Sequence, residues 1–120
     1  MIQASLRIVP PAEKLWELRN VMRALTGPTE VAKGCFECRV LQDAEGDGGL
    51  TYLVQFESMN QMETHLRSWR FRRLLPYIEL SVQPPEFEMY SLERIGEIES
   101  LIAVLGSESN DSGSALDPDQ

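Results

Sequence analysis

The only histidine of the chain, His65, is the side chain best suited to move a proton near neutral pH. It follows Met62 by three residues and precedes Trp69 by four, so the three would share one side of a helix. An imidazole there could accept a proton from a molecule bound between this helix and a sheet. The alternative is a boundary histidine that only donates a hydrogen bond to a main-chain carbonyl.

Cys35 and Cys38 have the spacing of a redox pair or of half a zinc site. Redox pairs usually open a helix, whose N-terminus lowers the thiol pKa. These cysteines fall in a predicted strand, where positions three apart point to opposite faces. A structural zinc ion would need two further ligands, and the chain has no third cysteine. We therefore expect two unlinked thiols, with Cys38 in the core, and no metal site.

Four arginines lie close together after the histidine, namely Arg67, Arg70, Arg72 and Arg73. They could hold a carboxylate or a phosphate of a ligand, because guanidinium groups bind such anions through paired hydrogen bonds. The alternative is a solvated helix face. The sequence has no glycine-rich phosphate-binding motif and no nucleophile elbow, so no nucleotide cofactor is expected.

The elements that would position these side chains follow the order β-α-β-β-α-β. Alternating or helical spacing of apolar residues predicts strands over residues 2–8, 35–42, 51–57 and 86–92, and helices over 12–25 and from 59 onward. Gly27-Pro28 is expected to end the first helix, and a capping box at Ser58 to begin the second. This order predicts an α+β, ferredoxin-like domain over residues 1–92 with an antiparallel sheet.

One face of the predicted sheet is apolar and the other is mixed. The mixed face carries leucine and tyrosine among opposite charges: Gln3, Ser5, Arg7, Glu37, Arg39, Leu41, Leu53, Gln55, Glu57, Glu88, Tyr90 and Leu92. The simplest cover is the same face of a second copy, which would close a dimeric α/β barrel. The alternative is a half-solvated antiparallel sheet. We expect a homodimer.

The C-terminal part is expected to differ from the rest of the chain. Residues 93–105 form an added amphipathic helix that would dock on its own domain or on the partner. Residues 106–120 are polar and acidic and are expected to be disordered.

Composition limits the partners that the protein is expected to have. The net charge of −8 disfavours nucleic acid, whose phosphates such a surface repels. No apolar run approaches the ~20 residues that cross a bilayer. Because the N-terminus also lacks the pattern of a secretory signal, we expect a cytoplasmic protein.

Three motifs occur together in this sequence. Gly34-Cys35 opens the second strand, Gln55-Phe56-Glu57-Ser58 ends the third, and a helix carries His65, Leu66, Ser68 and Phe71 as His-Leu-x-Ser-x-x-Phe. The combination resembles the antibiotic biosynthesis monooxygenase family of the dimeric α/β-barrel superfamily, over about residues 1–92.

The resemblance implies a homodimer of ferredoxin-like protomers, each with a cavity between its helices and its sheet. It also implies a cofactor-independent monooxygenase that uses O₂ on a small aromatic, quinol-like substrate. His65 would be the base or hydrogen-bond partner and Arg73 an anion partner. The cavity walls would be Trp69, Phe56, Tyr52, Phe36 and Met62.

The sequence departs from the family pattern at the end of the third strand. Many members have Glu-Trp there, whereas this chain has Gln55-Phe56. The haem-degrading members use that tryptophan, so haem degradation is not expected. A non-catalytic dimer that binds a small ligand or a protein, through its added C-terminal helix, remains the alternative function.

Overall fold

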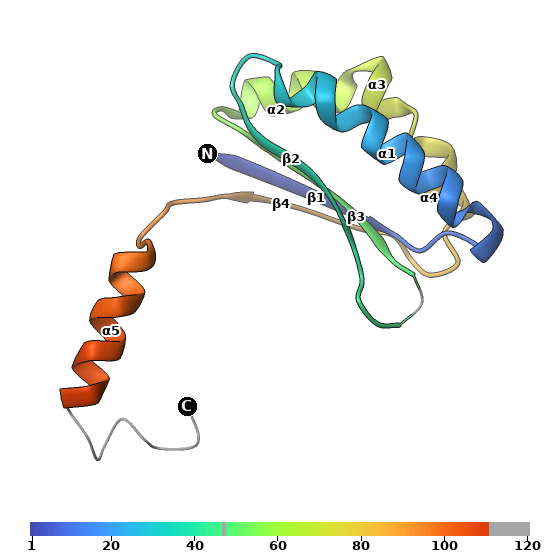
Figure 1. Ribbon diagram of the computed structural model, residues 1–120. Helices are drawn as coiled ribbons and strands as arrows, with labels where there is room; N and C mark the ends of the chain where they lie inside the picture. Colours follow the sequence, from blue (N-terminus) through green and yellow to red (C-terminus); the bar gives the residue numbers. More distant parts are fainter. Residues whose placement is uncertain (47, 111–120) are drawn as a thin grey trace.

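The computed structural model describes residues 1–46 and 48–110 (Figure 1). The elements, in chain order, are β1 (Ile2–Ile8), a short 3₁₀ turn η1 (Ala12–Lys14), α1 (Leu15–Glu30), β2 (Cys35–Gln42), β3 (Leu50–Phe56), α2 (Met59–Arg67), α3 (Trp69–Arg72), α4 (Leu75–Leu80), β4 (Glu86–Ser91) and α5 (Ile98–Asn110).

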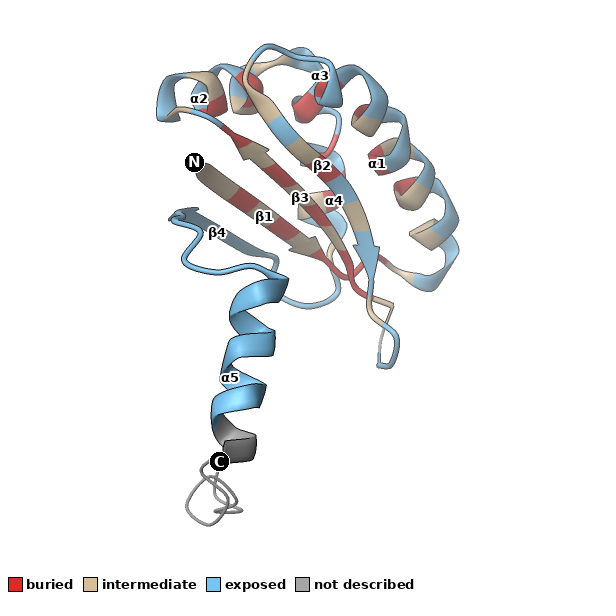
Figure 2. Ribbon diagram, turned by 60° about the vertical axis from the view of Figure 1, so that its left-hand side comes forward, coloured by how far each residue is buried: buried red, intermediate tan, exposed pale blue. Residues whose placement is uncertain are grey.

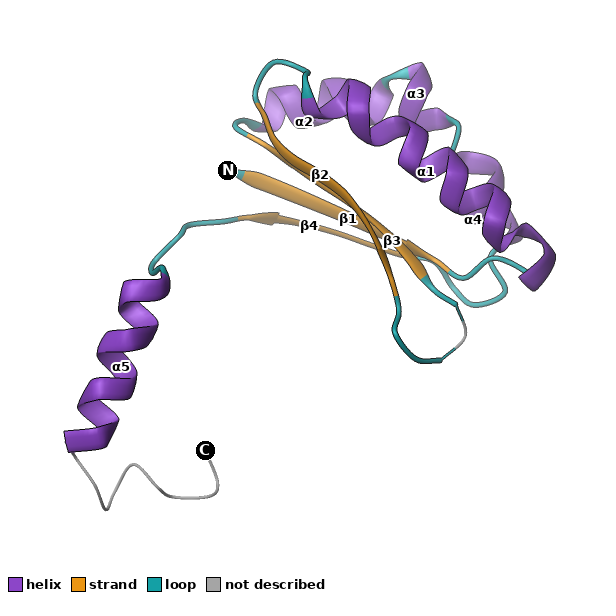
Figure 3. Ribbon diagram, viewed as in Figure 1, coloured by secondary structure: helices purple, strands orange, loops and turns teal. Residues whose placement is uncertain are grey.

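The strands form one antiparallel sheet in the order β2-β3-β1-β4. Helices α1 to α4 lie on one face of this sheet, and the opposite face is open (Figure 3). The predicted α+β ferredoxin-like fold is therefore confirmed, as a sheet that one chain leaves unclosed. The core lies between the helices and the sheet, and its buried members include Ala4, Leu6, Ile8, Leu18, Met22, Leu25, Tyr52, Val54, Phe56, Met62 and Leu74 (Figure 2).

Helix α1 continues through Gly27 and Pro28 to Glu30, so the predicted end at Gly27-Pro28 is wrong. Proline lacks an N–H and forfeits one helical hydrogen bond. The residue that follows it, Thr29, is nevertheless buried against the core. Packing of this last turn therefore keeps it helical, which a local stop signal does not anticipate.

Strand β2 contains a bulge at Phe36. Cys35 pairs with Phe56, whereas Glu37 pairs with Gln55, so Phe36 is the extra residue and is 59% exposed. Phe36, expected as a cavity wall, is turned outward for this reason. The bulge also brings Cys35 and Cys38 to the same, helix-covered side, and not to opposite faces as expected. Both thiols are free.

Two serines, Ser58 and Ser68, determine where α2 and α3 begin. Ser58 Oγ accepts a hydrogen bond from the Gln61 N–H, and Gln61 Oε1 accepts one from the Ser58 N–H, both at 3.2 Å. The predicted capping box is thus confirmed. Ser68 is extended (ψ 154°), which ends α2 and begins α3. Trp69 consequently opens a new helix and does not prolong the apolar stripe of α2.

The C-terminal part of the chain leaves the compact domain. All residues of β4 are exposed, and α5 extends away from the sheet and helices (Figure 1). No docking of α5 on its own domain occurs within the described residues. The helix runs to Asn110, so disorder from residue 106 is wrong for residues 106–110. The remainder of that predicted segment, 111–120, lies outside the described residues.

No helix within residues 1–46 and 48–110 is long and apolar enough to span a bilayer.

Candidate functional site

A cavity of about 320 Å³ opens between the C-terminal end of α1 with the turn after it, one side of α2, the start of α3 and the end of β3. Its floor is formed by the buried residues Thr29, Phe56 and His65. Its sides and rim are more exposed and comprise Pro28, Ala32, Lys33, Asn60, Gln61, Thr64, Ser68 and Arg70. A volume of this order suits a ligand of one or two aromatic rings.

His65 lies at the bottom of this cavity with 8% of its surface exposed. The rings of Phe56, Phe71 and Tyr52 surround it, with centroids at 5.3, 5.6 and 6.0 Å from the imidazole centroid. Burial in this aromatic environment lowers the pKa of His65 from 6.5 to about 4. The imidazole is therefore neutral at pH 7.

The phenol of Tyr52 connects His65 to the interior. Tyr52 Oη lies 3.0 Å from His65 Nε2 and 3.5 Å from Thr29 Oγ1, and it accepts a hydrogen bond from the Cys38 thiol at 3.2 Å. Burial raises the pKa of Tyr52 well above its usual range and the pKa of Cys38 to about 11. All four groups are consequently uncharged at neutral pH, and Cys38 is an unreactive thiol.

The other ring nitrogen of His65 is the one available to a ligand. Nδ1 has no hydrogen-bond partner among the described residues, and it is not among their buried unpartnered atoms, so solvent reaches it. If Tyr52 donates to Nε2, Nδ1 carries the proton and is a donor. If Nε2–H donates to Tyr52, Nδ1 is an acceptor and can take a proton from a substrate.

The His-Leu-x-Ser-x-x-Phe motif has a structural explanation in this arrangement. The Ser68 N–H and hydroxyl both donate to the carbonyl of His65, at 3.0 and 2.6 Å, and Ser68 Oγ accepts from the Phe71 N–H at 3.2 Å. The chain therefore turns directly after His65, and the ring of Phe71 reaches both His65 and Tyr52. The motif holds the imidazole over the cavity floor.

Two of the predicted site residues, His65 and Phe56, line the cavity. Tyr52 lies behind His65 and reaches the cavity only through it. Met62 lies on the core-facing side of α2, is fully buried and does not line the cavity.

The other three predicted residues lie away from the cavity lining. Phe36 is turned outward by the β2 bulge, and Trp69 is 66% exposed because Ser68 redirects the chain. Arg73 lies near Tyr77. The hydrogen bond to Glu17 raises the pKa of Tyr77, and the charge of Arg73 opposes this shift. Its neighbour in the arginine cluster, Arg70, is the one that lines the cavity.

Several cavity-lining residues were not predicted from the sequence, although helical spacing could have indicated some of them. Asn60, Gln61, Thr64, His65 and Ser68 recur on one side of a helix, next to the apolar stripe. The contributions of Thr29 and Lys33 had no such signal, because they come from α1 and the turn that follows it.

Metal ligation has little support from these side chains. Across the residues that the structure describes, no three His, Cys, Asp or Glu side chains lie close enough together to hold a metal ion.

Comparison with models of protein families shows the family to which the chain belongs. The model of the antibiotic biosynthesis monooxygenase family matches residues 1–76, more than half of the chain. The chain belongs to this family. The resemblance found in the sequence is therefore confirmed, whereas no curated protein matches the chain significantly.

Solved structures of family members and related proteins share the fold. A candidate antibiotic biosynthesis monooxygenase from Deinococcus radiodurans superimposes with a TM-score of 0.71 at 18% identity, over 81% of this chain and 97% of that one. A conserved protein from Methanosarcina mazei Go1 gives a TM-score of 0.68 at 25% identity, over 77% and 92%. Rv0793 from Mycobacterium tuberculosis gives 0.69 at 20%, over 79% and 98%.

Proposed function

We propose that the protein is a cofactor-independent monooxygenase that oxidises a small aromatic, quinol-like substrate with O₂. The observation that carries this proposal is the neutral imidazole of His65 at the floor of a cavity walled by aromatic rings. Family membership adds support, since it names the reaction class without naming a substrate.

The reaction needs no external reductant. One oxygen atom enters the ring and the other leaves as water, so a hydroquinone and O₂ become a hydroxyquinone and H₂O. The substrate supplies all four electrons. The protein's part is to bind the ring, to take the hydroxyl proton and to exclude bulk water while the electron-rich anion meets O₂.

His65 is the proposed proton acceptor, through Nδ1. With a pKa of about 4, it is a weak base in the empty cavity. A phenolate that forms beside the ring would raise this pKa, because a nearby negative charge favours the imidazolium. Tyr52 would hold the tautomer in which Nε2 carries its proton.

We also propose that the protein works as a homodimer in which the open sheet faces meet. The open face has half-buried Leu53 and exposed Leu41 and Tyr90, which a single chain leaves uncovered. Helix α5 presents a second uncovered apolar stripe at Ile98, Leu101, Ile102 and Leu105. We place this stripe on the partner copy, because α5 extends away from its own domain (Figure 1).

Oxygen consumption with a panel of hydroquinones would test the proposed activity. The rate above autoxidation should fall by about 10²-fold or more in His65→Ala. Glu63→Gln is a matched control, since Glu63 is exposed on the same helix and does not line the cavity. An equal rate in wild type and His65→Ala would contradict the role of His65. Saturable binding without oxygen consumption would favour the non-catalytic binding module instead.

A further inference from the structure

The charges around the cavity differ from those of the whole chain. The protein has 19 acidic and 11 basic side chains and a net charge of −8. The described residues that line the cavity nevertheless include two cations, Lys33 and Arg70, and no carboxylate. With His65 neutral, the cavity carries a net positive charge on an acidic protein.

Neither cation is neutralised by its neighbours. Within the described part of the chain, no carboxylate lies within 4.0 Å of Lys33 or Arg70. The other arginines after the histidine include two that make contacts on the helix surface. Arg67 approaches Glu63 at 3.9 Å, and Arg72 Nε donates to the carbonyl of Arg67 at 3.1 Å.

Arg70 is held in place by an aromatic ring. Its guanidinium carbon lies 5.2 Å from the centroid of Trp69, a cation–π contact. A cation–π contact does not use the hydrogen-bonding capacity of the guanidinium, whose five N–H groups can still bind an anion. Exposed Trp69 is thereby explained as a support for Arg70.

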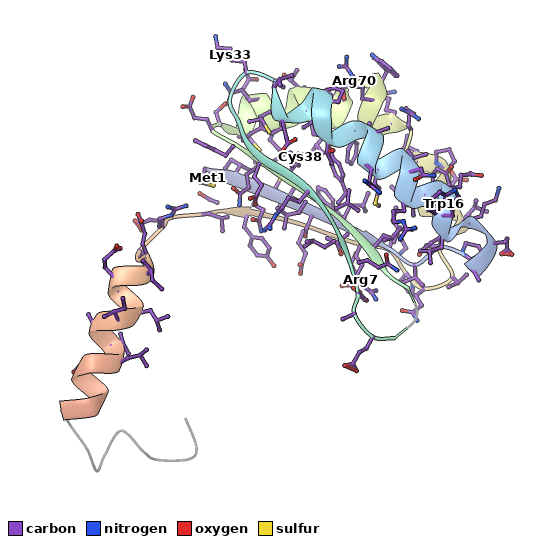
Figure 4. The ribbon with its side chains drawn as sticks, in the orientation of Figure 1. Met1, Arg7, Trp16, Lys33, Cys38 and Arg70 are labelled. Carbon is purple, nitrogen blue, oxygen red and sulfur yellow. The ribbon has the colours of Figure 1, made fainter. Side chains whose placement is uncertain are left out.

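The two cations come from different segments on the helix side of the molecule. Lys33 follows α1 and Arg70 belongs to α3, and both lie on the side opposite the open sheet face (Figure 4). They form part of the rim, whereas the apolar contact surface of Phe56 lies at the floor. A ligand that places its ring on the floor can therefore direct an anionic group to the rim.

We propose that the positively charged rim to which Lys33 and Arg70 belong attracts a carboxylate on the substrate, so that the substrate class is an aromatic hydroxycarboxylate and not a neutral quinol. The proposal deepens the function above and rests on it for the aromatic ring, but it concerns binding alone. The same positive charge favours the phenolate over the phenol.

Anaerobic calorimetric titration of the full chain tests the proposal, with 2,5-dihydroxybenzoate and its methyl ester as probes. The acid should bind at least tenfold more tightly than the ester at low salt, as charge-assisted hydrogen bonds allow. This preference should shrink to threefold or less in the double variant Lys33→Gln/Arg70→Gln. Both residues are exposed, so the fold should survive the substitutions.

The matched control is the double variant Arg67→Gln/Arg72→Gln, which removes the same charge from residues outside the lining. It should keep the wild-type preference. Equal binding of acid and ester, binding of neither, or an equal loss in both double variants would overturn the proposal. A carboxylate preference without oxygen consumption would support the anion site and contradict only the oxygenase function. Equal turnover of acid and ester would support the oxygenase function and contradict the anion site.

Discussion

Met62 of α2 and Met89 of β4 are both apolar residues of the domain but lie in different surroundings. Met62 is fully buried in the core, whereas Met89, opposite buried Ala4 in the sheet, is 38% exposed. The helices cover β2, β3 and β1 and stop short of β4. They leave an apolar groove of about 200 Å³ lined by Leu6, Leu66, Phe71, Ile78, Pro85 and Phe87. Within one chain, His65 is therefore enclosed by its neighbours, whereas the β4 edge of the sheet is exposed.

Truncating the two methionines should give the largest contrast. Met62→Ala should lower the free energy of unfolding by about 2–5 kcal/mol, because it leaves a cavity in a closed core. Met89→Ala should cost less than about 1 kcal/mol in an isolated protomer, since its side chain is already partly solvated. Urea unfolding at two protein concentrations measures both. If the loss of unfolding free energy in Met89→Ala grows with protein concentration, a second copy covers β4.

The pH dependence of stability should report the burial of His65. Its pKa is about 4 in the folded chain and about 6.5 when unfolded, so the unfolded state binds more protons between these values. Stability is thus fully present above about pH 6.5 and is lost as the pH falls toward 4, by up to about 3 kcal/mol. Urea unfolding from pH 7.5 to 4 should show a shallower loss in His65→Gln. Parallel curves would contradict a buried neutral imidazole.

Removing the hydroxyl of Tyr52 should have an intermediate effect. Tyr52→Phe leaves His65 Nε2 and the Cys38 thiol without their partner, and an unsatisfied buried group costs about 1–3 kcal/mol. Thermal unfolding gives the stability, and ¹⁵N chemical shifts of the imidazole give the tautomer. Thr64→Val, at the cavity rim on the helix that carries His65, serves as a control for stability only. An unchanged tautomer in Tyr52→Phe would show that Tyr52 does not set it.

Changes on α5 should have the smallest effect on the protomer itself. Leu101→Glu should alter the free energy of unfolding of a monomer by less than about 0.5 kcal/mol, because the side chain is exposed. It should weaken self-association at least tenfold if α5 packs on a partner. Light scattering over a dilution series measures this, with Ala103→Glu on the opposite side of the helix as control. Equal self-association of both variants would remove α5 from the interface.

Truncation after Leu92 complements this point substitution. The shortened chain should keep the fold of the compact domain, because α5 contributes no buried residue to its core. We would abandon this independence if the truncated chain were unfolded at a protein and denaturant concentration at which the full chain is still folded.

Features that depend on near neighbours followed from the sequence. The strands were predicted from alternation of apolar residues, the start of α2 from Ser58 and Gln61, and His65 from its type and its place beside a helix stripe. In each case the interacting atoms belong to residues a few positions apart. Local periodicity and capping chemistry then decide the outcome.

The surroundings of the site could not be predicted from the sequence, because they depend on contacts between distant segments. The outward turn of Phe36 depends on how β2 pairs with β3, and the low pKa of His65 depends on the aromatic rings that several elements bring around it. Lys33 and Arg70 line one cavity only because the end of α1, with the turn after it, and α3 lie on the same face of the sheet. The sequence alone determined the order of elements and singled out the histidine that we propose for proton transfer. Tertiary packing decided which charges and rings surround it, because pairing register and helix docking are not local properties.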